Sequence, residues 1–336
     1  MVLAIALASL SAAAEPLEEV RPDGASGRRT YKKPEPVSFV RIEKDSNQEP
    51  AKLQVATVRY VPTDGSKLSV TLYSAVHVGD AAFYENLNRS FTRHDALLYE
   101  LANDPEVLRE ENRDAPSIFS MLQMDMGSML GLSDQLKAID YNRPNFVHAD
   151  IPVEELVQHA QAEGEDLLTV TAQTLLDFQR MINRGDDPMA AMGGNGEDPS
   201  AAMDPLASLF GSGGDPRQLK RELAEQLVGQ TRDGILEGIT VLNRYLISAR
   251  NKRCLEVLDE QIAKGKTDLG IFYGAGHNPD LHRRLMADYG LKPVETTWVD
   301  AWDLNASVKP RASTADELSD EELLMHLMRR LLQSDR

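Results

Sequence analysis

Residues 68–80 read Leu-Ser-Val-Thr-Leu-Tyr-Ser-Ala-Val-His-Val-Gly-Asp, and this stretch decides the fold of the 336-residue chain. It begins with a run rich in apolar, β-branched and aromatic side chains, and a loop containing Gly65 precedes it. Such a run predicts a buried strand over residues 68–76. The strand leads directly into His77, so an imidazole is placed at its carboxyl end.

A helix and a second strand follow within 25 residues or so of sequence. Asp80 is placed to cap a helix, and the apolar face of that helix is expected to carry Phe83, Leu87 and Phe91. The apolar run 96–101 comes next and contains Glu100 near its end. Strand, helix and strand in this order predict a βαβ unit, in which the two strands are parallel and the crossover is right-handed.

Working outward from this unit, the chain predicts further strands on both sides. Strands are expected over 37–42 and 53–61 before it and over 268–273 near the end of the chain, and 291–304 is expected to form a closing strand or hairpin. Helical patterns are expected over most of 116–159, over 167–182, over 218–264 with a break near Gly234, and from an N-cap at Asn278. We therefore predict an α/β domain over 37–306, with a mixed, largely parallel central sheet flanked by helices and interrupted by helical insertions.

Four segments are predicted to lie outside this core. Residues 1–14 resemble a signal peptide, because the apolar run ends in Ala12-Ala13-Ala14, with an ordinary frayed N-terminal segment as the alternative. Residues 15–36 read as a disordered leader. Residues 184–215 read as a disordered insertion, and 307–336 contain an amphipathic helix that docks on the domain or forms a homodimer. We expect an exported protein, periplasmic or secreted, without a membrane span once the signal is removed.

The formal net charge of −17 argues against a nucleic-acid partner, because phosphate recognition needs a basic surface. Cys254 is the single cysteine, so no disulfide can form within the chain. Its place in a helical pattern is typical of a small buried apolar residue rather than a nucleophile.

Three potential metal ligands follow three predicted strands. His77, Glu100 and His277 each stand at or just beyond the carboxyl end of one, and these ends share one edge of a parallel sheet, where ligands bind. Two imidazoles and one carboxylate form a usual ligand set for a catalytic divalent ion. Each residue also has a simpler interpretation. His77 could be a polar residue at a strand end, and Glu100 could belong to a structural ion pair. The glycines before His277 could serve only a tight turn.

The same residues resemble a known family. Ser74-Ala75-Val76-His77, the strand that ends in Glu100, the pair Arg250-Asn251, and Gly274-Ala275-Gly276-His277 resemble in order and spacing the motifs of the TraB/PrgY/GumN/Tiki proteins. Serine at 74 departs from the glycine usual there. The resemblance implies an α/β fold related to the erythromycin-esterase and ChaN-like groups, and some animal members are metal-dependent peptidases.

Two functions are expected from these observations. The first is a metal-dependent hydrolase, a peptidase, with Mn²⁺, Co²⁺ or Zn²⁺ on His77, Glu100 and His277. Glu100 would be a ligand or the general base, and Arg250 and Asn251 would face the site and bind substrate. The alternative is a non-catalytic protein of the same fold that binds a peptide or a tetrapyrrole.

Overall fold

The structure is a computed structural model, and it describes residues 38–101, 130–162, 216–232 and 243–306, with isolated positions between 164 and 180. The expected signal peptide (1–14), leader (15–36), insertion (184–215) and C-terminal helix (307–336) lie outside the described residues. So does most of the helix expected over 167–182. In the part of the chain that is described, no helix combines the length and the apolar character needed to cross a membrane.

The centre of the molecule is a parallel four-stranded unit. Its strands are β3 (Ser69–Ala75), β8 (Asp268–Gly274), β5 (Ala96–Tyr99) and β7 (Phe146–His148), which lie side by side in this order. All three pairings are parallel. The predicted βαβ unit is therefore confirmed, and β8 is inserted between its two strands.

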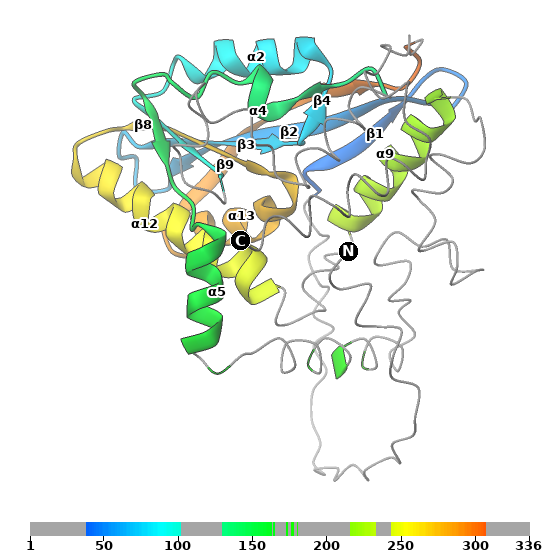
Figure 1. The fold of residues 1–336 in the computed structure, drawn as a ribbon. Helices are drawn as coiled ribbons and strands as arrows, with labels where there is room; N and C mark the ends of the chain where they lie inside the picture. Colours follow the sequence, from blue (N-terminus) through cyan, green and yellow to red (C-terminus); the bar gives the residue numbers. More distant parts are fainter. Residues whose placement is uncertain are drawn as a thin grey trace, which may run out of the picture.

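An antiparallel extension completes this sheet. Strand β2 (Pro50–Pro62) pairs along one edge with β1 (Val40–Lys44) and then with β3, and along its other edge with β9 (Leu291–Asp303). A separate two-stranded sheet joins β4 (Val78–Gly79) to β6 (Ser133–Asp134). The predicted fold class is confirmed: a mixed sheet with mostly parallel strands, flanked by helices (Figure 1).

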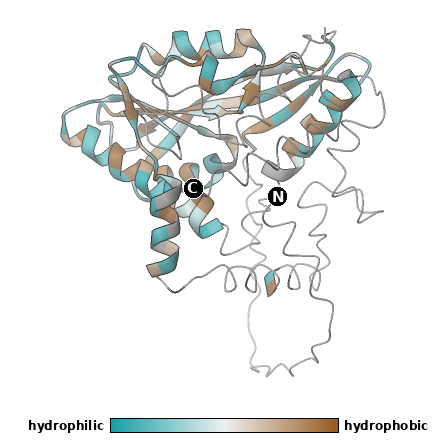
Figure 2. Ribbon diagram, in the orientation of Figure 1, coloured by the Kyte–Doolittle hydropathy of each residue, from teal (hydrophilic) through white to brown (hydrophobic). Residues whose placement is uncertain are grey.

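Helices cover both faces of the sheet because its central strands are apolar on both sides. In β5, Leu97 packs into the cluster beneath α2 (Ala81–Phe91), while Leu98 packs into the cluster on the opposite face. That second cluster contains residues of α12 (Arg250–Ala263) and α13 (Asn278–Ala287). Successive side chains of a strand point to opposite faces, so this alternation fixes two cores around one sheet. Figure 2 shows apolar residues along the strands, between helices whose turns carry many hydrophilic ones.

Two of the predicted elements need correction. The region 116–159 is not mostly helical where it is described: it contains β6, the short helix α4 (Gln135–Ala138), β7 and the start of α5 (Val153–Ala162). The helix expected over 218–264 is described as α9 (Pro216–Arg232), the π-helical turn η5 (Asn243–Ala249) and α12. Residues 233–242, which include the expected break near Gly234, lie outside the described residues.

The strand register brings the carboxyl ends of the parallel strands to one level. Ala75 pairs with Gly274, and Tyr99 pairs with both Phe272 and His148. The chain therefore leaves β3, β8, β5 and β7 at the same edge of the sheet. Glu100, Asp150 and His277, which follow β5, β7 and β8, lie at this edge.

Candidate functional site

Glu100 is the first residue after β5, and its carboxylate points into the edge of the sheet. Its Oε2 atom accepts a hydrogen bond from the backbone N–H of Gly274, and its Oε1 atom lies 2.7 Å from Nη2 of Arg250. The side chain is 13% exposed. Burial by itself raises the pKa of this carboxyl, but the neighbouring side chains of His277, Arg250 and His77 outweigh burial and hold the pKa well below its ordinary value. Glu100 is therefore a buried, ionised carboxylate.

His277 lies at the end of the 3₁₀ turn η6 (Ala275–His277), directly before α13. Its Nδ1 atom is 2.7 Å from Oδ1 of Asn251. The amide nitrogen of Asn251 donates to the carbonyl of His277 and to Asp280, which orients the amide so that its oxygen faces the imidazole. An oxygen acceptor at Nδ1 assigns the proton to that atom, so a neutral ring presents the lone pair of Nε2.

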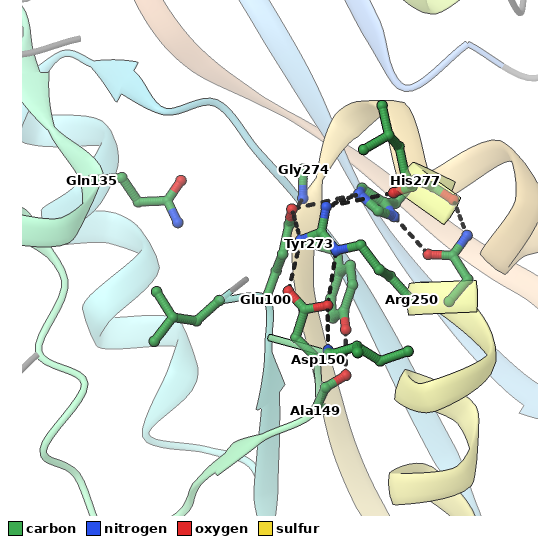
Figure 3. Close-up of polar contacts among 12 residues, drawn as sticks. Glu100, Gln135, Ala149, Asp150, Arg250, Tyr273, Gly274 and His277 are labelled. Atoms are coloured by element: carbon green, nitrogen blue, oxygen red, sulfur yellow. Dashed lines mark hydrogen bonds and ion pairs between the residues drawn. The ribbon is translucent and has the colours of Figure 1, made fainter. Parts of the chain in front are cut away.

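The Nε2 atom of His277 faces Glu100 at a distance of 3.4 Å from Oε1. Nη1 of Arg250 lies 3.3 Å from the same Nε2 atom, so the guanidinium contacts both the carboxylate and the imidazole (Figure 3). The guanidinium places a positive charge in contact with both the carboxylate and the imidazole. The site is therefore built to hold positive charge at this point.

Arg250 itself is held by a residue that the sequence reasoning did not select. The carboxylate of Asp150, which follows β7, accepts two hydrogen bonds from Arg250, at 2.9 Å to Nε and 2.6 Å to Nη2. The Asp150 side chain is 0% exposed, and a buried carboxylate needs such a partner. The signal in the sequence was an acidic residue shortly after the run Phe146-Val147, a pattern similar to the one that identified Glu100.

Figure 3 shows how these groups converge from separate elements: Glu100 from the end of β5, Asp150 from the loop after β7, Arg250 from α12 and His277 from the turn after β8. Arg250 and Asn251 are consecutive in α12, yet they serve different partners. Arg250 binds the two carboxylates, whereas Asn251, which is 0% exposed, orients His277. Neither is a surface residue.

His77 is the proposed ligand that the structure leaves apart. Its side chain is exposed, and it forms no hydrogen bond or ion pair with Glu100 or His277 among the described residues. Its backbone carbonyl accepts a hydrogen bond from the backbone N–H of Gln135, and its imidazole is near enough to lower the pKa of Glu100. His77 therefore stands beside the Glu100–His277 pair without touching it.

Both predicted helix caps are corrected by the structure. Asp80 occupies the N-cap position of α2, but its side chain makes no capping bond and instead contacts Lys220 and the backbone N–H of Asp303. Asn278 is the first residue of α13 rather than its cap. It is fully buried, and its amide donates to Oγ of Ser74 at 2.7 Å. Asn278 does not cap the helix because its side-chain amide is buried against β3, where it is hydrogen-bonded to Ser74.

The hydrogen bond from Asn278 gives Ser74 a structural role. Its hydroxyl donates to the carbonyl of Ala56 in β2 and accepts from Asn278, so it links β2, β3 and α13 beneath the site. The serine at position 74 is thus a buried structural bridge, which a glycine could not form.

The Glu100–His277 pair has the spacing of two ligands to one ion. Two ligand atoms about 2.1 Å from a tetrahedral ion are about 3.4 Å apart, and this is the separation of Oε1 and Nε2. A neutral imidazole and an ionised carboxylate are the forms that ligate a metal ion. However, among the described residues no group of three or more His, Cys, Asp or Glu side chains is arranged to hold a metal ion. The residues present offer a divalent ion two ligand atoms, Oε1 of Glu100 and Nε2 of His277, and Arg250 contacts both atoms in this structure.

Comparisons of the chain with protein-family models, with curated proteins and with solved structures found no significant match.

Proposed function

We propose that this protein is a metal-dependent hydrolase that cleaves peptide bonds, a member of the TraB/PrgY/GumN/Tiki group. The observation that carries the proposal is the 3.4 Å contact between His277 and Glu100 at the carboxyl edge of the parallel strands. The order of the sequence motifs supports the family, and the peptide substrate follows from the resemblance.

In this proposal His277 and Glu100 hold the ion and His77 completes the ligand set when the ion binds. The ion, Mn²⁺, Co²⁺ or Zn²⁺, would act as a Lewis acid and lower the pKa of a bound water. Arg250 would bind the carbonyl oxygen or a carboxylate of a substrate with the N–H groups that contact His277 and Glu100 in the free protein. Asn251 holds the imidazole of His277 in the ligating tautomer.

In this proposal the two carboxylate oxygens of Glu100 have different roles, one holding the side chain in place and the other taking part in the reaction. Its Oε2 atom is held by the backbone of Gly274, whereas Oε1 faces His277 and Arg250. An Oε1 atom on the ion makes Glu100 a ligand, and an Oε1 atom beside the attacking water makes it the general base. The variant Glu100→Gln separates the two roles. If Glu100 is the general base, the variant keeps the ion and loses activity. If Glu100 is a ligand, the variant loses both the ion and the activity.

We further propose that the protein acts after export, in a periplasm or outside the cell, on peptide or protein substrates. These proposals come from the apolar start of the sequence and the family resemblance. A homodimer through the helix in 307–336 remains the proposed assembly.

A non-catalytic binding protein of the same fold, for a peptide or a tetrapyrrole, is the second candidate. One observation favours it: the guanidinium of Arg250 already neutralises Glu100 and contacts Nε2 of His277, so the pair is stable without a metal ion. In that case a chelator leaves binding unchanged and no peptide is cleaved. A tetrapyrrole would give a visible absorption band in the purified protein.

The experiment measures metal content and peptide cleavage on the same samples. Purified protein is loaded in turn with Mn²⁺, Co²⁺ and Zn²⁺, dialysed, analysed for metal and assayed with internally quenched peptides. We expect about one ion per chain, and loss of both metal and activity in His277→Ala. The control Glu85→Gln, on the exposed face of α2, should match the wild type in both. Full metal content in His277→Ala would place the ion elsewhere and overturn the proposal.

A further inference from the structure

A buried amide stands beside the candidate site with one atom unpartnered. Gln135 is the first residue of α4, and its side chain is only 6% exposed. Its Nε2 atom donates to the hydroxyl of Tyr141 at 3.0 Å. Its Oε1 atom is fully buried and has no hydrogen-bond partner among the described residues. Leaving a buried acceptor unpaired costs free energy, so such an atom needs a reason.

The position of Gln135 links it to the candidate site on two sides. Its backbone N–H donates to the carbonyl of His77 at 2.9 Å, so it is fixed next to the proposed third ligand. Its partner Tyr141 is close to Glu100: burial raises the pKa of Tyr141, and the charge of Glu100 raises it further. In Figure 3 the amide end of Gln135 is directed toward Glu100, from the side opposite Arg250.

The other unpartnered buried side-chain atoms in the described structure lie in different settings. Oδ1 of Asn278 belongs to an amide already engaged with Ser74 beneath the site, and Nε of Arg221 belongs to a side chain that pairs with Glu49 and Asn305. Gln135 differs because its amide end is directed toward Glu100, the proposed metal ligand (Figure 3). An unpaired acceptor there is available to the N–H group of a ligand.

We propose that Gln135 is a substrate-positioning residue whose Oε1 atom accepts a hydrogen bond from a backbone N–H of the peptide substrate. This inference rests on the proposed function, since it names a contact to the substrate of that same site. A peptide N–H would give Oε1 the partner that the free protein lacks. Substrate binding would thus remove the cost of the unpaired acceptor, which favours ligands with an N–H at this point over isosteres without one.

The test uses peptides in which single N–H groups are replaced. Internally quenched peptides that the wild-type protein cleaves are compared with analogues in which one peptide bond away from the cleaved bond is an ester. For the wild type, one ester position should lower kcat/KM about tenfold, because the hydrogen bond to Oε1 is lost. For Gln135→Met the same ester should change nothing, and its all-amide peptide should already show the reduced value.

A matched variant separates the free atom from the bond to Tyr141. Tyr141→Phe removes the partner of Nε2 and leaves Oε1, so it should keep the sensitivity of the wild type to the ester. Gln135→Asn shortens the side chain and withdraws the oxygen, so it should lose that sensitivity. Thermal unfolding checks each variant, and because Oε1 has no partner in the free protein, Gln135→Asn and Gln135→Met should remain folded.

The possible failures are distinct. A wild-type protein that is indifferent to every ester, or a Gln135→Met variant that keeps the wild-type sensitivity, would overturn this inference alone. Loss of folding in both Gln135 variants would also overturn it, because the amide would then serve the fold. Metal-loaded wild type that cleaves no peptide would overturn the proposed function, and this inference with it.

Discussion

The imidazole of His277 and the carboxylate of Glu100 meet with Nε2 and Oε1 3.4 Å apart, at the edge where β8 and β5 end. Arg250 contacts both groups of this pair, the imidazole through Nη1 and the carboxylate through Nη2. Every element of the site serves this arrangement: Gly274 holds the other carboxylate oxygen, Asn251 orients the ring, and Asp150 holds the guanidinium.

Replacing Asp150 should destabilise the fold and release Arg250. Asp150→Asn keeps the shape of the side chain but leaves the buried guanidinium with Glu100 as its remaining charged partner. Breaking a buried ion pair from one side costs about 3 kcal/mol of unfolding free energy. Urea denaturation measures this change. The control Asp140→Asn breaks an exposed pair with Arg143 and should cost less than about 1 kcal/mol. Equal effects of the two variants would contradict the role given to Asp150.

Replacing Asn251 should weaken metal binding through His277. Asn251→Leu removes the acceptor at Nδ1, so the ring is no longer held in the tautomer that presents Nε2. Loss of such an orienting contact typically lowers metal affinity 10- to 100-fold, about 1.4 to 2.8 kcal/mol. Titration calorimetry with Zn²⁺ checks this. Lys252→Leu, one residue along and 73% exposed, introduces the same side chain at the surface and should bind Zn²⁺ like the wild type.

The two glycines before His277 should respond differently to alanine. A Cβ at Gly274 would lie 3.1 Å from Oε2 of Glu100, whereas a Cβ at Gly276 would have nothing within 4 Å. Gly274→Ala therefore displaces the carboxylate and should lower peptide cleavage about tenfold, because small misplacements of a catalytic group are costly. Gly276→Ala should retain activity, and a loss as large as that of Gly274→Ala would show that the glycines serve only the turn.

Asp95 should give the protein a stability that is lost in acid. Its Oδ2 atom accepts hydrogen bonds from the backbone N–H groups of Thr267 and Asp268, each at 3.0 Å, and these bonds lower the pKa of Asp95 below its ordinary value. A carboxyl whose pKa is lower in the folded state stabilises the fold above the unfolded pKa. This contribution disappears as pH falls through the folded pKa.

The variant Asp95→Asn should therefore flatten the dependence of unfolding free energy on pH between about pH 5 and pH 2. Urea denaturation at several pH values measures the slope for both proteins. Identical slopes would mean that the hydrogen bonds from Thr267 and Asp268 to Asp95, which join the loop before β5 to the start of β8, add no pH-dependent stability.

The sequence predicts the central βαβ unit because its signals are local. The apolar runs of β3 and β5 and the spacing of Phe83, Leu87 and Phe91 each report on one element, and the structure buries all of them. Strand β7 was missed because it is only three residues long and lies between polar loops. A strand this short is defined by its hydrogen bonds to the neighbouring strand, here β5, and not by its own sequence.

The candidate site was predictable to the extent that it lies at strand ends. His277 and Glu100 follow β8 and β5, and parallel strands place their carboxyl ends together. Asp150 was not selected because its partner Arg250 is distant in the sequence and its own strand was not recognised. The capping role predicted for Asn278 was wrong for a similar reason: its partner Ser74 is brought near only by the fold.

The most direct test of the central claim is a crystal structure of the protein soaked with Mn²⁺, in which anomalous scattering locates the ion. The account predicts one peak within about 2.3 Å of both Oε1 of Glu100 and Nε2 of His277, with the imidazole of His77 drawn toward it. An anomalous map without a peak at these two atoms, with Arg250 still in contact with both of them, would contradict it.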